Sequence, residues 1–139
     1  MKIFIICSKA FYGEIKSIKE YLENKGYEVF VPHTYLNPEK EMEAWVGETH
    51  SEFKARMFRL SEERIKEMDA VLVLNYEKHG IKNYIGGSTF LEMYEAFMQD
   101  KKIYVYTNLP DEDFVLYDDI KAINPICLDE GIERKKLDD

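Results

Sequence analysis

The hydrophobic residues of the chain gather in short, almost continuous runs. Five of these runs have the length and apolar content of strands: KIFIIC (2–7), YEVFV (27–31), AVLVL (70–74), IYVY (103–106) and PICL (125–128). A strand that is covered on both faces shows such a continuous run rather than strict alternation of apolar and polar residues. The pattern therefore predicts five buried strands.

Between these runs, hydrophobic residues recur at helical spacing. The first such stripe contains Ile15, Ile18 and Leu22 and ends at Asn24-Lys25-Gly26, a sequence typical of a helix C-terminus. An imperfect stripe follows from about residue 51 to 68, and further helices are predicted over 88–99 and near 112–123.

Strands that alternate with helices indicate parallel pairing through right-handed crossovers, in a sheet covered on both faces. We therefore predict a three-layer α/β sandwich, Rossmann-like or flavodoxin-like, with a five-stranded parallel sheet. The chain shows no repeat, low-complexity stretch or linker, so residues 1–139 are expected to form a single domain. Ligands of such folds bind at the carboxyl ends of the strands, where the strand order reverses.

The composition narrows the range of partners. With 139 residues and 45% hydrophobic content, the chain suits one compact core. Its net charge of −8 argues against nucleic-acid binding, which needs a dense Lys/Arg surface. No apolar run approaches the ~20 residues that cross a bilayer, and the N-terminal run is too short for a signal peptide. We expect a cytoplasmic protein with no nucleic-acid or membrane partner.

The sequence offers no motif for a metal or a common cofactor. Cys7 and Cys127 form no CxxC pair and have no histidine at a metal-ligand spacing. The glycines match neither a Walker A loop nor GxGxxG, which makes nucleoside triphosphate chemistry an unfavoured interpretation. We expect two free core thiols in a reducing compartment, and no cofactor or metal.

The segment GGST at the start of the third helical stretch, 88–99, has two interpretations. Ser88 or Thr89 can cap the helix, and Thr89 with Glu92 has the spacing of a capping box. Alternatively, the backbone amides after Gly86 and Gly87 bind an anionic or hydroxyl-rich group, which Glu92 faces from one turn into the helix. The local pattern fits both.

Other polar residues follow the predicted strands at the edge where a ligand is expected. Ser8 and Lys9 follow the first strand, His33 the second and Asn75 the third. The loop 76–88, which follows the third strand, is predicted to be either a mobile lid over a pocket or a contact between two copies of the chain. A carboxylate beside a sugar carbon suits glycosidic chemistry, so the ligand expected here is a small molecule.

The order of KIFIICSKAF, VFVPH, MDAVLVLN, GGSTFLEMYEAF and KKIYVY, over residues 2–107, resembles the nucleoside 2-deoxyribosyltransferase superfamily. That group includes deoxynucleoside 5'-monophosphate N-glycosidases. The resemblance implies that Glu92 is a nucleophile that forms a covalent sugar–enzyme intermediate. It also implies that Ser8 and His33 meet the substrate, that Ser88 helps to hold a phosphate, and that a homodimer or higher homo-oligomer can complete the site.

The chain departs from that family at three positions. A tyrosine that orients the nucleophile is replaced by Phe4, an aspartate before the third strand by Ser61, and an acid after that strand by Asn75. These changes leave two main hypotheses. The protein either cleaves or transfers the N-glycosidic bond of a nucleoside or nucleoside 5'-monophosphate, or it binds a nucleotide or sugar phosphate without turnover. A scaffold that acts through a homodimer is a third.

Overall fold

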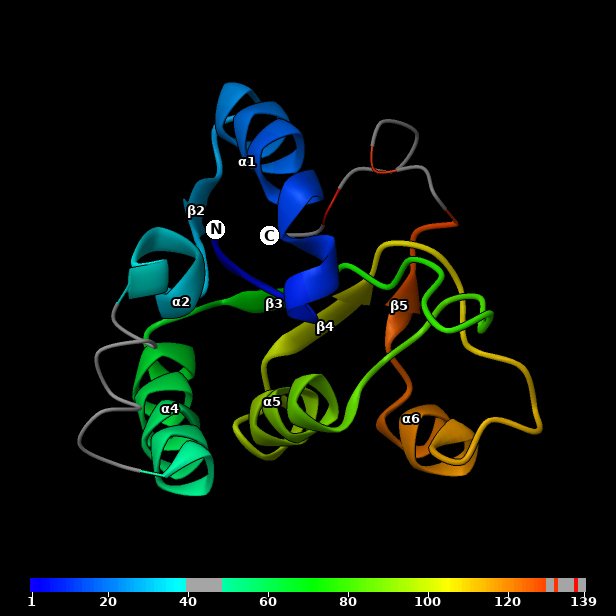
Figure 1. The fold of residues 1–139 in the computed structure, drawn as a ribbon. Helices are drawn as coiled ribbons and strands as arrows, with labels where there is room; N and C mark the ends of the chain where they lie inside the picture. The colour runs from blue at the N-terminus through cyan, green and yellow to red at the C-terminus, as the bar shows by residue number, and fades with distance from the viewer. Residues whose placement is uncertain (40–48, 130–131, 133–136, 138–139) are drawn as a thin grey trace.

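The computed structural model describes residues 1–39, 49–129, 132 and 137. Five parallel strands form one sheet in the order β2-β1-β3-β4-β5 (Figure 1). The strands are β1 (Lys2–Ile6), β2 (Glu28–Phe30), β3 (Ala70–Val73), β4 (Lys102–Val105) and β5 (Ile126–Cys127). Each strand lies within the run predicted for it, except β4, which begins one residue earlier. The prediction of a five-stranded parallel α/β sandwich is confirmed.

Helices cover both faces of the sheet. They are the 3-10 helix η1 (Lys9–Glu14) and the α-helices α1 (Ile15–Asn24), α2 (His33–Leu36), α4 (His50–Lys66), α5 (Gly87–Met98) and α6 (Tyr117–Ile123). On one face, Ile3 and Leu72 pack with residues of η1 and α1. On the other face, Phe4 and Val71 pack with α4, α5 and α6. Alternate residues of one strand thus enter two cores, which explains the continuous apolar runs.

The last predicted helix differs most from its expected bounds. A helix was expected near residues 112–123, whereas α6 spans Tyr117–Ile123 and turns precede it. None of the helices in the described ranges has both the length and the hydrophobicity that a membrane-spanning helix needs.

The order of the strands reverses between β1 and β3. The chain first moves from β1 to β2 at the edge, and then crosses back through α4 to pair β3 with the other side of β1. Ile6 pairs with Val73, so both strands end at the same level. Connections that leave these ends toward opposite faces open a crevice there, which is the usual ligand site of such sheets.

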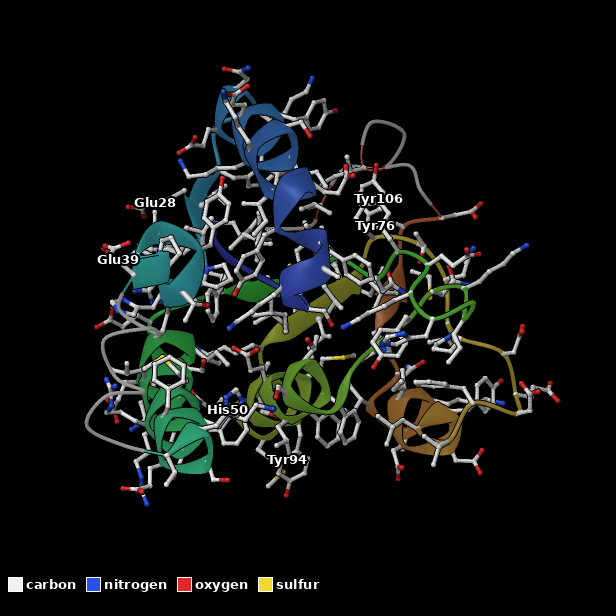
Figure 2. The ribbon with its side chains drawn as sticks, viewed as in Figure 1. Glu28, Glu39, His50, Tyr76, Tyr94 and Tyr106 are labelled. Atoms are coloured by element: carbon white, nitrogen blue, oxygen red, sulfur yellow. The ribbon has the colours of Figure 1, made fainter. Side chains whose placement is uncertain are left out.

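An aromatic group lies at the ends of β3 and β4. The rings of Tyr76 and Tyr106 lie 5.4 Å apart between centroids (Figure 2), and the edge of Phe11 packs on Tyr76 at 5.5 Å. Burial raises the pKa of Tyr76 above its ordinary range, so this tyrosine stays protonated at neutral pH. The group belongs to the core that η1 and α1 cover.

Candidate functional site

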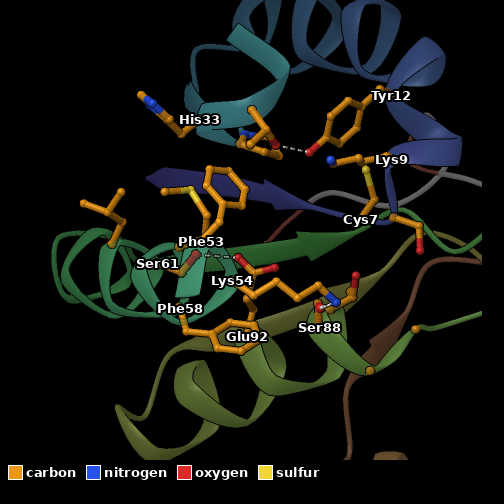
Figure 3. Close-up of a pocket in the computed structure, with 18 of the residues that line it drawn as sticks. Cys7, Lys9, Tyr12, His33, Phe53, Lys54, Phe58, Ser61, Ser88 and Glu92 are labelled. Atoms are coloured by element: carbon orange, nitrogen blue, oxygen red, sulfur yellow. Dashed lines mark hydrogen bonds between the residues drawn. The ribbon is translucent and has the colours of Figure 1, made fainter. Parts of the chain in front are cut away.

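A cavity of about 600 Å³ lies beside the end of β1 and is enclosed by η1, α2, α4 and the first turns of α5 (Figure 3). Its volume is within the range of small-molecule sites, roughly 300–1,000 Å³. Most of the residues predicted to bind a ligand line it: Ser8, Lys9, His33, Gly86, Gly87, Ser88, Thr89 and Glu92. The structure thus brings together residues from three separate strand ends.

Asn75 lies apart from this group. Its side chain is fully buried, donates to the carbonyl of Asn108 across 2.8 Å and accepts from the amide of Thr107 at 3.0 Å. The hydroxyl of Thr107 donates in turn to the Asn75 carbonyl at 3.0 Å. Asn75 therefore joins the ends of β3 and β4, and it is absent from the residues that line the cavity.

Helix α5 presents Glu92 to the cavity. The Ser61 hydroxyl on α4 donates to Oε2 of Glu92 across 2.8 Å. Oε1 has no hydrogen-bond partner. Every fully buried side-chain oxygen of the described residues does have a partner, so Oε1 is not fully buried. It follows that Oε1 is open to the cavity. Burial raises the pKa of Glu92 to about 7, and the hydrogen bond from Ser61 opposes that rise. Near neutral pH, both the acid and the carboxylate are populated.

The start of α5 differs from the predicted cap. Gly86 is the N-cap residue, with φ −80° and ψ 169°, and no side chain caps the helix, so the capping prediction for Ser88 and Thr89 is wrong. Ser88 instead accepts a hydrogen bond from Nζ of Lys54 at 3.2 Å. The first-turn amides have no intrahelical partner and lie at the positive end of the helix dipole, an arrangement that suits an anion.

Gly86 allows this turn to approach β1 closely. A Cβ atom at this position would lie 3.4 Å from Oγ of Ser8 and 3.4 Å from a ring carbon of Tyr84. That distance is at the short limit of ordinary van der Waals contact, so a side chain at this position would pack tightly against Ser8 and Tyr84. The glycine therefore contributes to the shape of the cavity wall.

Positive charge predominates on the cavity wall. Among the described lining residues, Glu92 is the only acid, whereas Lys9, Lys54, Arg64 and Lys78 are basic. This local excess contrasts with the net charge of −8 on the whole chain. Because a concave site focuses the field of its lining charges, the cavity favours an anionic ligand.

Several wall residues come from α4 and were not predicted as site residues. Lys54, Met57, Phe58, Ser61 and Arg64 recur every three or four positions, so they share one face of that helix, and all of them line the cavity. This periodicity was visible in the sequence. The sequence did not show that this face of α4 is directed at the start of α5.

Two hydrogen bonds join neighbouring elements around the cavity. The Tyr12 hydroxyl and Oγ1 of Thr34 are hydrogen-bonded at 2.6 Å, which links η1 to α2 (Figure 3). Arg64 donates to the Val31 carbonyl at 2.9 Å, and its guanidinium lies 5.5 Å from the centre of the Phe4 ring. These contacts help to fix the shape of the cavity. Among the described residues, no charged side chain forms a hydrogen bond or ion pair with Glu92.

The thiol in the cavity is a poor nucleophile. Cys7 and Cys127 are both free, and Cys7 follows β1 at the cavity wall. Burial, and secondarily the charge of Glu92, raise the pKa of Cys7 to about 12. The thiolate is the reactive form of cysteine, and it is scarce at neutral pH. Across the described residues, no group of three or more His, Cys, Asp and Glu side chains is placed to hold a metal ion.

No protein-family model and no curated protein sequence matches the chain. A solved structure, that of the CMP N-glycosidase BcmB of Clostridium botulinum, superposes with a TM-score of 0.53. The match covers 93% of this chain and 89% of that one, at 17% sequence identity. The two proteins share a fold. At this identity the likeness extends to the arrangement of the sheet and helices.

Proposed function

We propose that this protein cleaves or transfers the N-glycosidic bond of a nucleoside 5'-monophosphate, with Glu92 as the nucleophile. The observation that carries the proposal is the carboxyl group of Glu92, which is held by Ser61 through one oxygen and open to a ligand-sized cavity through the other. The similar fold of a protein described as a CMP N-glycosidase supports it.

The chemistry follows from the placement of one carboxylate. Glycosidic cleavage passes through a transition state with positive charge on the sugar, which a nearby carboxylate stabilises and then attacks. Oε1 of Glu92 forms a bond to the anomeric carbon, the carbon–nitrogen bond breaks, and the base leaves with that electron pair. Water then attacks the same carbon, one of its protons returns to the group that protonated the base, and the sugar phosphate and the carboxylate are released. If a second base attacks instead of water, the sugar is transferred.

A proton for the leaving base has two candidate sources. His33 and Tyr12 both line the cavity, on α2 and η1. Either group can supply or relay a proton to a nitrogen atom of the base when the two are within hydrogen-bonding reach. Both lie on the wall across from Ser88, which suits a substrate whose base and phosphate point in opposite directions (Figure 3).

The basic wall favours a phosphorylated substrate. Lys54 already donates to Ser88 at the first turn of α5, so an ammonium, a hydroxyl and free helix amides converge at one place. Each of these groups is a donor to phosphate oxygens, and the helix dipole adds to the attraction. We therefore place the 5'-phosphate beside Ser88 and the sugar beside Glu92.

The test is release of free base from a panel of nucleosides and their 5'-monophosphates, followed by liquid chromatography. We expect release from monophosphates by the wild type, and loss of release in Glu92→Gln. Glu95→Gln, on the same helix but outside the cavity lining, is the matched control and should retain activity. Mass spectrometry of the quenched reaction should detect a sugar phosphate on Glu92. Equal release by Glu92→Gln would refute the proposal.

A binding module without turnover is the second candidate. Its support is the lack of an ionisable hydrogen-bond partner for Glu92, since Ser61 and the neighbouring Phe4 carry no acid. Calorimetry with nucleoside monophosphates separates the two candidates. Binding without base release favours the module, whereas absence of binding and of release rejects both.

We also propose that the protein self-associates through α5. The exposed side of this helix carries Leu91, Tyr94, Phe97 and Met98, each between 44% and 59% exposed. Tyr94 points away from the sheet (Figure 2). An exposed apolar strip of this kind is typical of an interaction surface, and a second copy of the chain could cover it. Light scattering should give the mass of a dimer, and Tyr94→Asp should give a monomer; a wild type that is already monomeric rejects this.

A further inference from the structure

Glu92 receives its hydrogen bond from a different helix. Ser61 lies on α4 and Glu92 on α5, 31 positions further along the chain. The two helices pack side by side on one face of the sheet (Figure 1). The bond of 2.8 Å between Ser61 Oγ and Glu92 Oε2 therefore depends on the register of the two helices.

This bond makes the two carboxylate oxygens unequal. Oε2 is engaged, whereas Oε1 is unpartnered and open to the cavity. The terminal torsion of a glutamate is intrinsically broad, so a free carboxylate would sample many orientations. A hydroxyl that donates to a carboxylate forms a short, charge-assisted bond, which restricts this rotation. The lone pairs of Oε1 are consequently directed at the ligand space.

No other described side chain holds this carboxylate. Phe4, on the neighbouring wall, has no hydroxyl. Arg64, one turn beyond Ser61 on α4, is engaged by the Val31 carbonyl at 2.9 Å and lies over the Phe4 ring. Lys54 is engaged by Ser88. The orientation of Glu92 thus depends on Ser61.

We infer that Ser61 is a positioning residue for Glu92: its hydroxyl holds Oε2 and leaves Oε1 to form the bond to the anomeric carbon. The inference rests on the proposed function. During the reaction Oε1 donates the electron pair, the base nitrogen takes the pair of the broken bond, and Ser61 keeps its proton throughout. Ser61 acts through Glu92 and makes no bond to the reacting atoms.

Replacement of Ser61 leaves the other titratable groups at the cavity unchanged. These groups are Cys7 after β1, Lys9 and Tyr12 of η1, His33 of α2, His50, Lys54 and Arg64 of α4, and Lys78 and Tyr84 in the loop after β3. The hydrogen bond from Ser61 lowers the pKa of Glu92 against the effect of burial. If the acid limb of the pH–rate profile shifts when Ser61 is replaced, the shift therefore measures the effect of the Ser61–Glu92 hydrogen bond on the pKa of Glu92.

The test compares Ser61→Ala, Ser61→Thr and the control Ser51→Ala, at an exposed position in the first turn of α4. We expect kcat for base release to fall roughly 10- to 100-fold in Ser61→Ala, which is the effect of one hydrogen bond to a charged group. KM should change little, and the acid limb should move to higher pH. Ser61→Thr, which keeps the hydroxyl, should recover most of the rate, and Ser51→Ala should match the wild type.

A carboxyl ¹³C NMR titration of Glu92 separates this inference from the proposed function, because it needs no turnover. The pKa of Glu92 should rise in Ser61→Ala above the wild-type value of about 7 and return in Ser61→Thr. A wild type that releases no base refutes the proposed function, while the titration still measures the bond. An unchanged pKa in Ser61→Ala, or an unchanged kcat in an active protein, overturns the inference.

Discussion

Replacement of Glu92 by glutamine should make the protein more stable, by an amount that grows as the pH rises above 4.5 and is complete above about 7. Burial removes part of the water that would solvate the carboxylate at this position, and the hydroxyl of Ser61 replaces only part of that solvation. Glutamine has nearly the same shape, keeps an oxygen that can accept from Ser61, and carries no charge. The variant therefore removes the cost of the buried charge while it preserves the packing.

The size of this effect follows from the pKa of Glu92. Burial raises the pKa from the ordinary value of 4.5 to about 7. At about 1.4 kcal/mol for each unit, the difference corresponds to about 3 kcal/mol in the free energy of unfolding. Because Oε1 keeps contact with the water of the cavity, this is an upper value.

The sign of the pH dependence is fixed by the direction of the shift. Between pH 4.5 and about 7 the folded protein holds a proton that the unfolded chain has released, so the folded state loses stability as the pH rises. Above pH 7 the full cost is present. Glu92→Gln should thus match the wild type near pH 4.5 and exceed its stability by up to about 3 kcal/mol near pH 8.

Urea denaturation followed by far-ultraviolet circular dichroism measures this difference at a series of pH values. Glu20→Gln, at an exposed position of α1, is the control for loss of one negative charge from a chain of net charge −8. The reasoning is refuted if Glu92→Gln gives the same difference in stability at every pH, or if it is less stable than the wild type at pH 8.

Three further predictions concern activity and the strand ends. Base release should rise with pH and reach half its maximum near pH 7, because only ionised Glu92 attacks; a profile that is flat between pH 5 and 9 contradicts this. Lys54→Met should raise KM for 5'-monophosphates about tenfold or more and leave phosphate-free nucleosides unaffected, because it removes the cation beside Ser88; steady-state kinetics on paired substrates measure both. Asn75→Ala should lower the free energy of unfolding by about 2–3 kcal/mol, because it leaves the buried amide of Thr107 unpaired; urea denaturation measures the loss, and an unchanged midpoint contradicts it.

The strands could be predicted because their surroundings leave few alternatives. In β1 and β3 every residue after the first contacts one of two cores, so the hydrophobic pattern itself encodes a strand covered on both faces. The start of α5 could not be predicted in the same way. The N-cap position is occupied by Gly86, which has no side chain to accept a hydrogen bond, and the hydroxyl of Ser88 accepts from Lys54 of another helix. A tertiary contact therefore engages the Ser88 hydroxyl in place of a local cap.

The sequence could predict those residues of the candidate site whose position is set by the backbone alone. Parallel strands end at one edge, which is why residues after β1 and β2, such as Ser8 and His33, meet Glu92 at a single cavity. The same rule located Asn75 at that edge but not the direction of its side chain, which faces the end of β4. The contribution of α4 depends on how a crossover helix packs against α5, and no local pattern encodes that register.

The partly desolvated acid of Glu92 determines what kind of compound should block the cavity. A partly desolvated carboxylate is stabilised strongly by a positive charge beside it. The sugar carries such a charge in the transition state. A cyclic amine of pentose size with a phosphate tail presents an ammonium to Glu92 and an anion to Lys54. Its binding should drive Glu92 into the ionised form and release a proton into neutral buffer, so the measured heat should vary with the ionisation enthalpy of the buffer.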